Sequence, residues 1–200
     1  MNDTGGRGSG GDNGDPRDQQ DDGHLIEVQI ESLDIYRGRL LHIKLDRVRL
    51  PDGSEATREY IVHPGAAMII PILPDGKLLM ERQYRYPIGE VMLEFPAGKL
   101  DPGEAALATA QRELLEETGY RAAHWEWLAG VHPIVSYSTE RIEIFLATDL
   151  VKERAQLDAG EFLETLALDF ADAYTRMKAG EITDVKTIIG LYQLRDRGWS

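Results

Sequence analysis

Hydrophobic and polar residues alternate along several stretches of the chain, and this alternation is typical of a strand with one buried face. Residues 25–33 alternate in this way, as do residues 39–50 and 55–63. Pro51, Asp52 and Gly53 separate the last two stretches, and these residue types favour a tight turn. The pattern therefore predicts one strand followed by a β-hairpin.

A different pattern follows, because residues 66–73 are apolar throughout. Such a run predicts a strand at the centre of a sheet. A second Pro-Asp-Gly turn at 74–76 leads into residues 77–86, so we expect a second hairpin here. Further strands are predicted at 91–98, 124–131 and 141–150.

The segment between the predicted strands at 91–98 and 124–131 predicts a helix from Pro102 to Thr118. Asp101 is the expected N-terminal cap, and Glu104 can complete a capping box. Gly119 suits the left-handed position that follows many helices.

Two more helices are predicted near the end of the chain. They begin after Asp169 and Asp184, and Gly180 is expected to end the first of them. The expected buried face of the second is formed by Ile188, Ile189, Leu191 and Leu194. Strands mixed with helices predict an α+β or α/β layered domain. Residues 1–24 are nearly devoid of apolar side chains and predict a disordered tail.

Composition and charge narrow the function. The formal net charge is -13, which argues against a nucleic-acid partner because affinity for phosphate backbones rests on Lys and Arg. No stretch approaches the roughly 18 apolar residues of a membrane helix. The chain has 0 Cys, which removes disulfides, thiolate catalysis and Cys-based zinc sites. We read no signal peptide at the N-terminus and expect a cytoplasmic protein.

The predicted helix at 102–118 gathers negative charge. Its expected core face is formed by Leu107, Ala110 and Leu114. At about 100° per residue, Glu113, Glu116 and Glu117 fall within an arc of about 100° beside that face. Like charges at this spacing repel, and a bound divalent cation reverses the effect. The alternative is an acidic surface helix balanced by Arg112 and other bases nearby.

The spacing around this helix is more specific than its charge. The residues that define the spacing are Gly98, Glu104, Arg112, Glu113, Glu116, Glu117 and Gly119. They resemble the Nudix box at all of its fixed positions, with Tyr120 where an aliphatic residue is usual. The resemblance implies an α+β fold of the α/β/α sandwich type, with a mixed sheet between helices. It also implies a hydrolase that uses divalent metal to cleave a diphosphate.

The resemblance assigns roles to residues of the box. The implied metal ligands are Ala97, through its carbonyl oxygen, and Glu104, Glu113, Glu116 and Glu117. The expected metal is Mg²⁺, with Mn²⁺ as the other candidate. Arg112 would orient the carboxylates through charge-assisted hydrogen bonds. For Glu104, holding Arg112 or closing the capping box are the alternatives.

Segments outside the box resemble one branch of the family, the ADP-ribose pyrophosphatases and nucleoside diphosphate sugar hydrolases. These segments are 82–90, 93–104, 136–147 and 180–191. The resemblance implies hydrolysis of ADP-ribose or a related nucleoside diphosphate sugar to a nucleoside monophosphate and a sugar phosphate. Glu140, on the loop after the box, is the expected general base, with Glu116 or Glu104 as alternatives.

Substrate phosphates also need cationic side chains. Arg82 and Arg85 are three residues apart on a predicted strand, so they should point to opposite faces. By resemblance, Arg82 is expected to face the substrate, and Arg85, Arg58 and Tyr36 are further candidates.

The branch also implies a homodimer formed through the strands of residues 25–63, with 64–200 as the Nudix catalytic domain. A nucleotide-sensing module of the same fold, without catalysis, is the alternative function. The sugar and base stay open among ADP-ribose, GDP-mannose, ADP-glucose and similar compounds.

Overall fold

The computed structural model describes residues 22–154, 160 and 162–200. The tail predicted at 1–24 lies outside these residues except for its last part, where Asp22–Leu25 form a short 3-10 helix. The strands are β1 (Val28–Arg37), β2 (His42–Arg49), β3 (Glu55–Ile61), β4 (Ala66–Pro71), β5 (Leu78–Arg85), β6 (Glu90–Glu94), β7 (Ala97–Lys99), β8 (Tyr120–Val131), β9 (Ile142–Lys152) and β10 (Leu163–Leu168). The helices are α1 (Ala106–Thr118), α2 (Phe170–Lys178) and α3 (Val185–Asp196).

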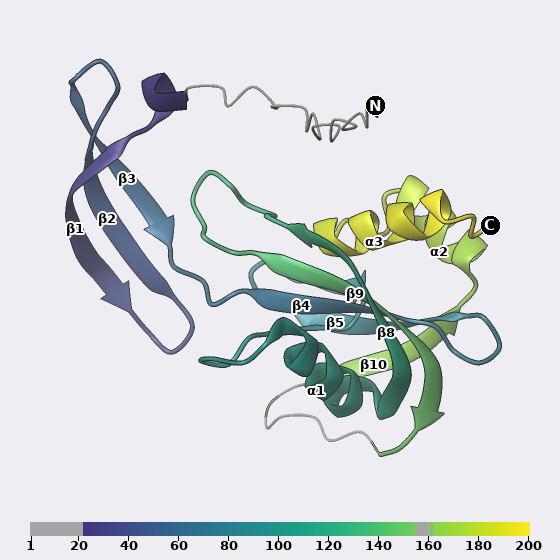
Figure 1. Cartoon of the computed structure of the whole chain (residues 1–200). Helices are drawn as coiled ribbons and strands as arrows, with labels where there is room; N and C mark the ends of the chain where they lie inside the picture. Colours follow the sequence, from purple (N-terminus) through teal and green to yellow (C-terminus); the bar gives the residue numbers. More distant parts are fainter. Residues whose placement is uncertain (1–21, 155–159, 161) are drawn as a thin grey trace, which may run out of the picture.

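Strands β1, β2 and β3 form a separate antiparallel sheet. The predicted hairpin around Pro51–Gly53 is confirmed, since the amide of Leu50 donates to the carbonyl of Ser54 at 2.8 Å. Figure 1 shows this sheet standing apart from the rest of the molecule and joined to it by the segment that leads into β4. Much of β1 is exposed to solvent.

A four-stranded mixed sheet, in the order β7-β4-β9-β8, forms the centre of the molecule. All six residues of β4 are buried, and β4 runs parallel to β9 and antiparallel to β7. The apolar run therefore lies inside the sheet, as predicted, with strands on both of its edges and helices packed on both of its faces.

The second predicted hairpin is only partly correct. The turn at 74–76 forms, with the amide of Leu73 donating to the carbonyl of Lys77 at 2.8 Å. Beyond a single bridge between Ile72 and Leu78, however, β4 and β5 separate into different sheets. Strand β5 pairs with β10 and β6, because β4 already has β7 and β9 as its neighbours.

The predicted strand at 91–98 is likewise divided. Its first part is β6, in the sheet with β5, and its last part is β7, beside β4. Phe95 and Pro96 carry the chain from one sheet to the other. Strand β10, which completes the β10-β5-β6 sheet, was not predicted from the sequence.

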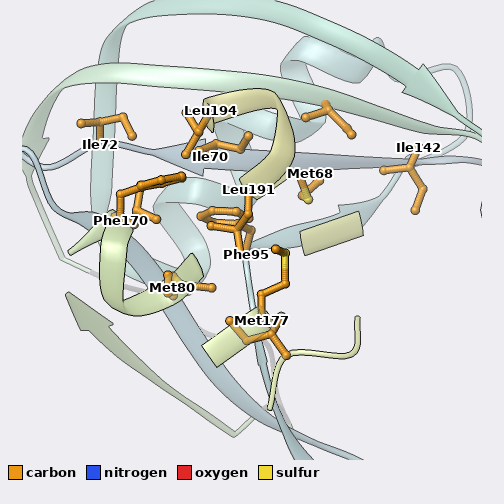
Figure 2. Packing of buried hydrophobic residues seen from close by; sticks show 14 of the residues in the cluster. Met68, Ile70, Ile72, Met80, Phe95, Ile142, Phe170, Met177, Leu191 and Leu194 are labelled. Carbon is orange, nitrogen blue, oxygen red and sulfur yellow. The ribbon is translucent and has the colours of Figure 1, made fainter. Parts of the chain in front are cut away.

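Helices cover both faces of the central sheet (Figure 1). Alternate residues of β4 point to opposite sides: Ala67 and Ile69 pack with α1, while Met68 and Ile70 pack with α2 and α3. Figure 2 shows the larger of these clusters, which brings Phe95 together with Met68 and Ile70 of β4 and with Leu191 and Leu194 of α3. The mixed sheet between helices confirms the predicted α+β class. No helix in the described part of the chain is long and apolar enough to cross a membrane.

Helix α1 begins at Ala106 and not at Pro102 as predicted. Gly103 has φ of 79°, a left-handed conformation that ends any helix there, and the amide of Glu104 donates to the carbonyl of Asp101 in a turn. The expectation for Leu107 was also wrong, since it is 40% exposed. The contacts with the sheet are made by Ala106, Ala110 and Leu114, which are spaced four residues apart on one face, and Leu107 lies outside this set.

The other helix ends agree with the sequence. Gly119 follows α1 in the left-handed conformation, with φ of 71°. Asp184 caps α3, and its carboxylate accepts the amide hydrogen of Thr187 at 3.0 Å. Asp169 occupies the equivalent position before α2 without a side-chain hydrogen bond.

Candidate active site

A cavity of about 480 Å³ lies where the β7-β4-β9-β8 sheet, the β10-β5-β6 sheet, α1 and the start of α3 meet. It combines side chains that are far apart in the sequence. The polar and charged lining residues are Gln83, Arg85, Lys99, Glu113, Glu117, Glu140, Asp184 and Lys186, and the backbone of Ala97 and Gly98 contributes as well.

Glu113 and Glu117 form the acidic part of the lining and lie one turn apart on α1. Strand β7 passes directly beside them. A Cβ placed on Gly98 would stand 1.9 Å from both Cδ and Oε1 of Glu113, so only glycine allows this approach. The backbone of Gly98 therefore lies against the carboxylate of Glu113, and Ala97 lines the same cavity.

Arg112 holds three carboxylates together. Its Nη1 donates to Glu113 at 2.7 Å and to Glu116 at 3.1 Å. Its Nε and Nη2 donate to the two oxygens of Glu104 at 3.1 and 3.0 Å. These carboxylates raise the pKa of Arg112 well above its ordinary value. The guanidinium thereby offsets the repulsion among the glutamates of the box.

Glu104 has a fixed place in this network. The hydrogen bonds from Arg112, from the amide of Asp101 and from the hydroxyl of Thr109 together lower the pKa of Glu104 to about 2. Neither Glu104 nor Glu116 lines the cavity. Among the described residues, no three acidic or histidine side chains are arranged as a closed metal cage. The proposed ligand roles of these two residues stay predictions.

A second cluster of charged side chains consists of Arg85, Asp184 and Lys186, which line the cavity, and of Glu94, which they contact or surround but which does not line it. Glu94 is only 2% exposed and accepts two hydrogen bonds from Arg85, at 2.7 and 2.9 Å. Lys186, at the start of α3, donates to Glu94 and lies 3.0 Å from Asp184. Burial raises the pKa of Glu94, but the hydrogen bonds and charges of Arg85 and Lys186 outweigh burial and leave that pKa below its ordinary value.

The structure separates the two arginines of β5, as alternation requires, while the role of Arg82 in substrate binding stays a prediction. Arg85 lines the cavity, whereas Arg82 lies on the other face and pairs with Glu164 of β10 at 3.1 Å. Sequence reasoning fixed the relative orientation of the two side chains. It did not fix which of them points to the cavity, because that depends on how β5 is placed in its sheet.

The remaining predicted substrate residues lie on the separate sheet. Arg58 is on β3, where its Nε donates to Glu27 at 2.9 Å, and Tyr36 is on β1 with 54% of its surface exposed. Neither lines the cavity within this chain. Their assignment to substrate binding stays a prediction.

Glu140 does line the cavity, as expected for a residue that acts on a bound substrate. It ends the loop between β8 and β9. Its Oε1 lies 3.7 Å from Nε2 of His63, a residue of the segment that connects β3 to β4. Glu140 and the α1 residues Glu113 and Glu117 therefore line the same cavity.

Several residues of the site were missed from the sequence. Glu94, His63 and Lys186 were not singled out, although one signal was present for the first of them. Glu94 interrupts an apolar stretch that is otherwise typical of a buried strand, and a charge in such a stretch requires a buried partner. The partners come from distant segments, so the sequence gives no indication of their identity.

Comparison with known proteins agrees with the site. Residues 62–186 match the NUDIX domain, and residues 27–61 match the nucleoside diphosphate sugar hydrolase N-terminal domain. The chain therefore belongs to the Nudix family and is a hydrolase of the type related to ADP-ribose pyrophosphatases. Nudix hydrolases generally use a divalent metal.

Individual relatives indicate which branch of the Nudix family the chain is similar to. The chain is 34% identical to an ADP-ribose pyrophosphatase of Bacillus subtilis over 173 residues, which cover 86% of this chain and 94% of the relative. It is 38% identical to a methanol dehydrogenase activator of Bacillus methanolicus over 176 residues, covering 86% and 95%. The crystal structure of an ADP compounds hydrolase superposes with a TM-score of 0.78 at 25% identity, covering 88% of this chain and 98% of that one.

Proposed function

We propose that the protein hydrolyses the diphosphate bond of ADP-ribose or a related nucleoside diphosphate sugar in a reaction that requires Mg²⁺. The products are a nucleoside monophosphate and a sugar phosphate. The observation that carries the proposal is a single cavity lined both by the box carboxylates Glu113 and Glu117 and by the cationic groups of Arg85 and Lys186. The names of the relatives support the substrate class.

The residues present fit a hard divalent cation. Glu113 and Glu117 offer carboxylate oxygens, and Ala97, whose carbonyl oxygen is a further candidate ligand, lines the same cavity. Oxygen donors of this kind suit Mg²⁺ or Mn²⁺ and suit softer metals poorly. When bound, the cation supplies positive charge against the diphosphate oxygens, where negative charge grows during phosphoryl transfer.

The protein's own groups have separate tasks. Arg112 holds Glu113 and Glu116 of α1, so that their oxygens are in place before the metal binds. Arg85 offers a guanidinium to the diphosphate from the cavity wall. Glu140 takes a proton from the attacking water, acting as the general base. Substrate held between these groups reacts in a fixed orientation.

The assembly and location expected from the sequence stay predictions. We propose a cytoplasmic homodimer whose interface includes residues 25–63, with 64–200 as the catalytic domain. The large apolar side chains on the separate sheet support this interface, because more than half of the surface of Val28, Ile35 and Tyr36 is exposed. A partner copy would cover them.

A second candidate function rests on a specific relative, since one protein of similar length is named as an activator of another enzyme. In that case the chain would act on a partner protein, with or without hydrolysis. The complete set of box residues in the sequence favours hydrolysis.

The test is a panel of nucleoside diphosphate sugars assayed with Mg²⁺ and with Mn²⁺. Liberated phosphate is measured after phosphatase treatment, and AMP is identified by chromatography. We expect turnover of at least one ADP sugar. Tight binding of ADP-ribose without release of AMP under either metal would favour a sensing module.

Glu117→Gln tests the site within the same assay. We expect kcat to fall on the order of 10²-fold or more, because one ligand charge is lost while the shape is kept. Glu153→Gln is the matched control, since Glu153 is an exposed partner of Arg121 outside the cavity. Equal kcat values for Glu117→Gln and Glu153→Gln would show that Glu117 of α1 has no part in catalysis.

A further inference from the structure

We propose that His63 is a positioning residue for Glu140, and that it holds one carboxylate oxygen so that the other faces the reacting water. The inference rests on the proposed function, in which Glu140 is the general base. His63 belongs to the connection between the separate sheet and the central sheet, and it is not part of the box.

The backbone determines which nitrogen of the His63 ring carries hydrogen. The amide of Gly65 donates to Nδ1 of His63 at 3.1 Å. A nitrogen that accepts a hydrogen bond is not protonated, so the hydrogen of the neutral ring lies on Nε2. Nε2 is the atom that lies 3.7 Å from Oε1 of Glu140. The ring therefore presents a donor to the carboxylate.

The separation of 3.7 Å is longer than a direct hydrogen bond, which spans about 2.7 to 3.2 Å. Both side chains are largely shielded, with 16% of His63 and 22% of Glu140 exposed. A direct hydrogen bond requires the two atoms to come closer by about 0.5 Å. Hydrogen bonds between catalytic groups are commonly long before substrate binds and shorten in the complex.

Backbone hydrogen bonds keep the two residues together. The amide of Ile61 donates to the carbonyl of Tyr137 at 2.9 Å, and the amide of Thr139 donates to the carbonyl of Ile61 at 3.0 Å. The amide of His63 donates to the hydroxyl of Thr139 at 2.9 Å. Residues 61–63 thus run beside 137–139, and this attachment fixes the distance between His63 and Glu140.

Glu140 has a further local constraint, because its own amide donates to the hydroxyl of Ser138 at 3.1 Å. The backbone at Glu140 is held by the loop, while the direction of its carboxylate is set by the His63 ring. A carboxylate has two oxygens, so engagement of Oε1 leaves Oε2 to accept the proton of water. Loss of the ring donor would leave the base present but less well directed.

Two substitutions separate this role from a purely structural one. His63→Asn keeps an acceptor near the place of Nδ1 for the Gly65 amide but has no donor toward Glu140. His63→Gln places its amide nitrogen near the position of Nε2 and keeps that donor. We expect His63→Asn to lower kcat about tenfold with KM changed less than about twofold, and His63→Gln to keep kcat within about threefold of wild type.

The control variant is His124→Asn, since His124 is exposed on β8 and does not line the cavity. It should leave kcat and KM at their wild-type values. If His63 acts only on the Gly65 turn, His63→Gln will be the damaged variant and His63→Asn the active one. That result, or unchanged kcat in both, would overturn the inference.

A double-mutant cycle shows whether His63 works through Glu140. In a Glu140→Gln background, His63→Asn should have no further effect on kcat. If the two residues acted independently, the fold-reductions in kcat of the two single variants would multiply in the double variant. A large effect of Glu140→Gln with none of His63→Asn defeats only the positioning role. An absent effect of Glu140→Gln defeats the general base assignment in the proposed function.

A second measurement does not depend on turnover. Nitrogen-15 NMR of the full chain should show His63 as the tautomer protonated at Nε2, and Glu140→Gln should shift the Nε2 resonance. If the wild-type protein hydrolyses no substrate of the panel, this result still decides whether the contact exists. An unchanged Nε2 resonance, or a proton on Nδ1, would refute it.

Discussion

Gly98 lies directly against the carboxylate of Glu113, so that a Cβ on Gly98 would stand 1.9 Å from Glu113 Cδ. The backbone conformation of Gly98 is not in the left-handed region, so an alanine is allowed there by the backbone alone. The glycine is therefore required by the side chain across from it. A substitution at Gly98 therefore disturbs the Glu113 side chain without removing any carboxylate of the box.

Gly98→Ala should displace Glu113 and weaken metal binding more than it weakens the fold. We expect the rise in melting temperature on adding Mg²⁺, which follows from binding to the folded state, to be reduced or lost. The melting temperature without metal should change little. Calorimetry with and without Mg²⁺ makes both measurements, and a full Mg²⁺-dependent rise in the variant would show that Glu113 tolerates the displacement.

Arg85→Lys keeps the positive charge, but a lysine cannot both hold Glu94, as Nε and Nη2 of Arg85 do, and offer a guanidinium donor to the phosphate. We expect KM for the substrate to rise about tenfold, which corresponds to about 1.4 kcal/mol of binding. Arg82→Lys is the matched control on the same strand and should change KM less than twofold. Steady-state kinetics on both variants tests whether Arg85 binds the substrate. A larger rise in KM for Arg82→Lys than for Arg85→Lys would assign substrate binding to Arg82.

Glu94→Gln should destabilise the protein in a manner that depends on pH. At pH 7 we expect a loss of about 3 kcal/mol, because Arg85 and Lys186 lose a buried negative partner. The pKa of Glu94 is below its ordinary value of 4.5 in the folded protein. Its contribution is therefore fully present above about pH 4.5 and is lost as pH falls through the folded pKa.

Urea unfolding of both proteins between pH 7 and pH 3 measures this dependence. The difference in the free energy of unfolding should be largest at pH 7 and should shrink toward pH 3. Glu126→Gln, which removes an exposed partner of Arg197, should cost less than about 1 kcal/mol at every pH. A difference for Glu94→Gln that does not vary with pH would mean that its charge contributes nothing.

Val28→Lys tests the proposed dimer. Val28 lies on β1 and is 60% exposed, and Val151 on β9 is 64% exposed, so the two sites are matched in residue type and exposure. A buried interface would place the new charge of Val28→Lys in an apolar environment, which disfavours association. Light scattering should give a dimer for the wild type and for Val151→Lys, and a monomer for Val28→Lys. Monomeric wild type at micromolar concentration would contradict the proposal.

The part of the fold that the sequence predicts best is local. The turn at Pro51–Gly53, the cap at Asp184 and the left-handed Gly119 each follow from a few neighbouring residues. The spacing of the box also predicts the family, because a helix converts fixed spacings into a fixed arrangement of side chains.

Long-range features were less accessible. The sequence gives the strand character of β4 and β5 but does not show that they enter different sheets, because this depends on pairing with β9 and β10. The same limit explains why the sequence does not show which of Arg82 and Arg85 faces the cavity. The buried partners of Glu94 come from 9 and 92 residues away, so no local pattern connects them.

The attachment of Ile61 beside residues 137–139 has a consequence for how such chains diversify. The two matched domains meet between residues 61 and 62, which is where a recombination event would exchange one N-terminal module for another. Both backbone polar groups of Ile61 are hydrogen-bonded to the loop that ends in Glu140. Any replacement module would have to end in an extended residue in the same register, so the apparent boundary between modules is a shared structural unit that selection must keep together.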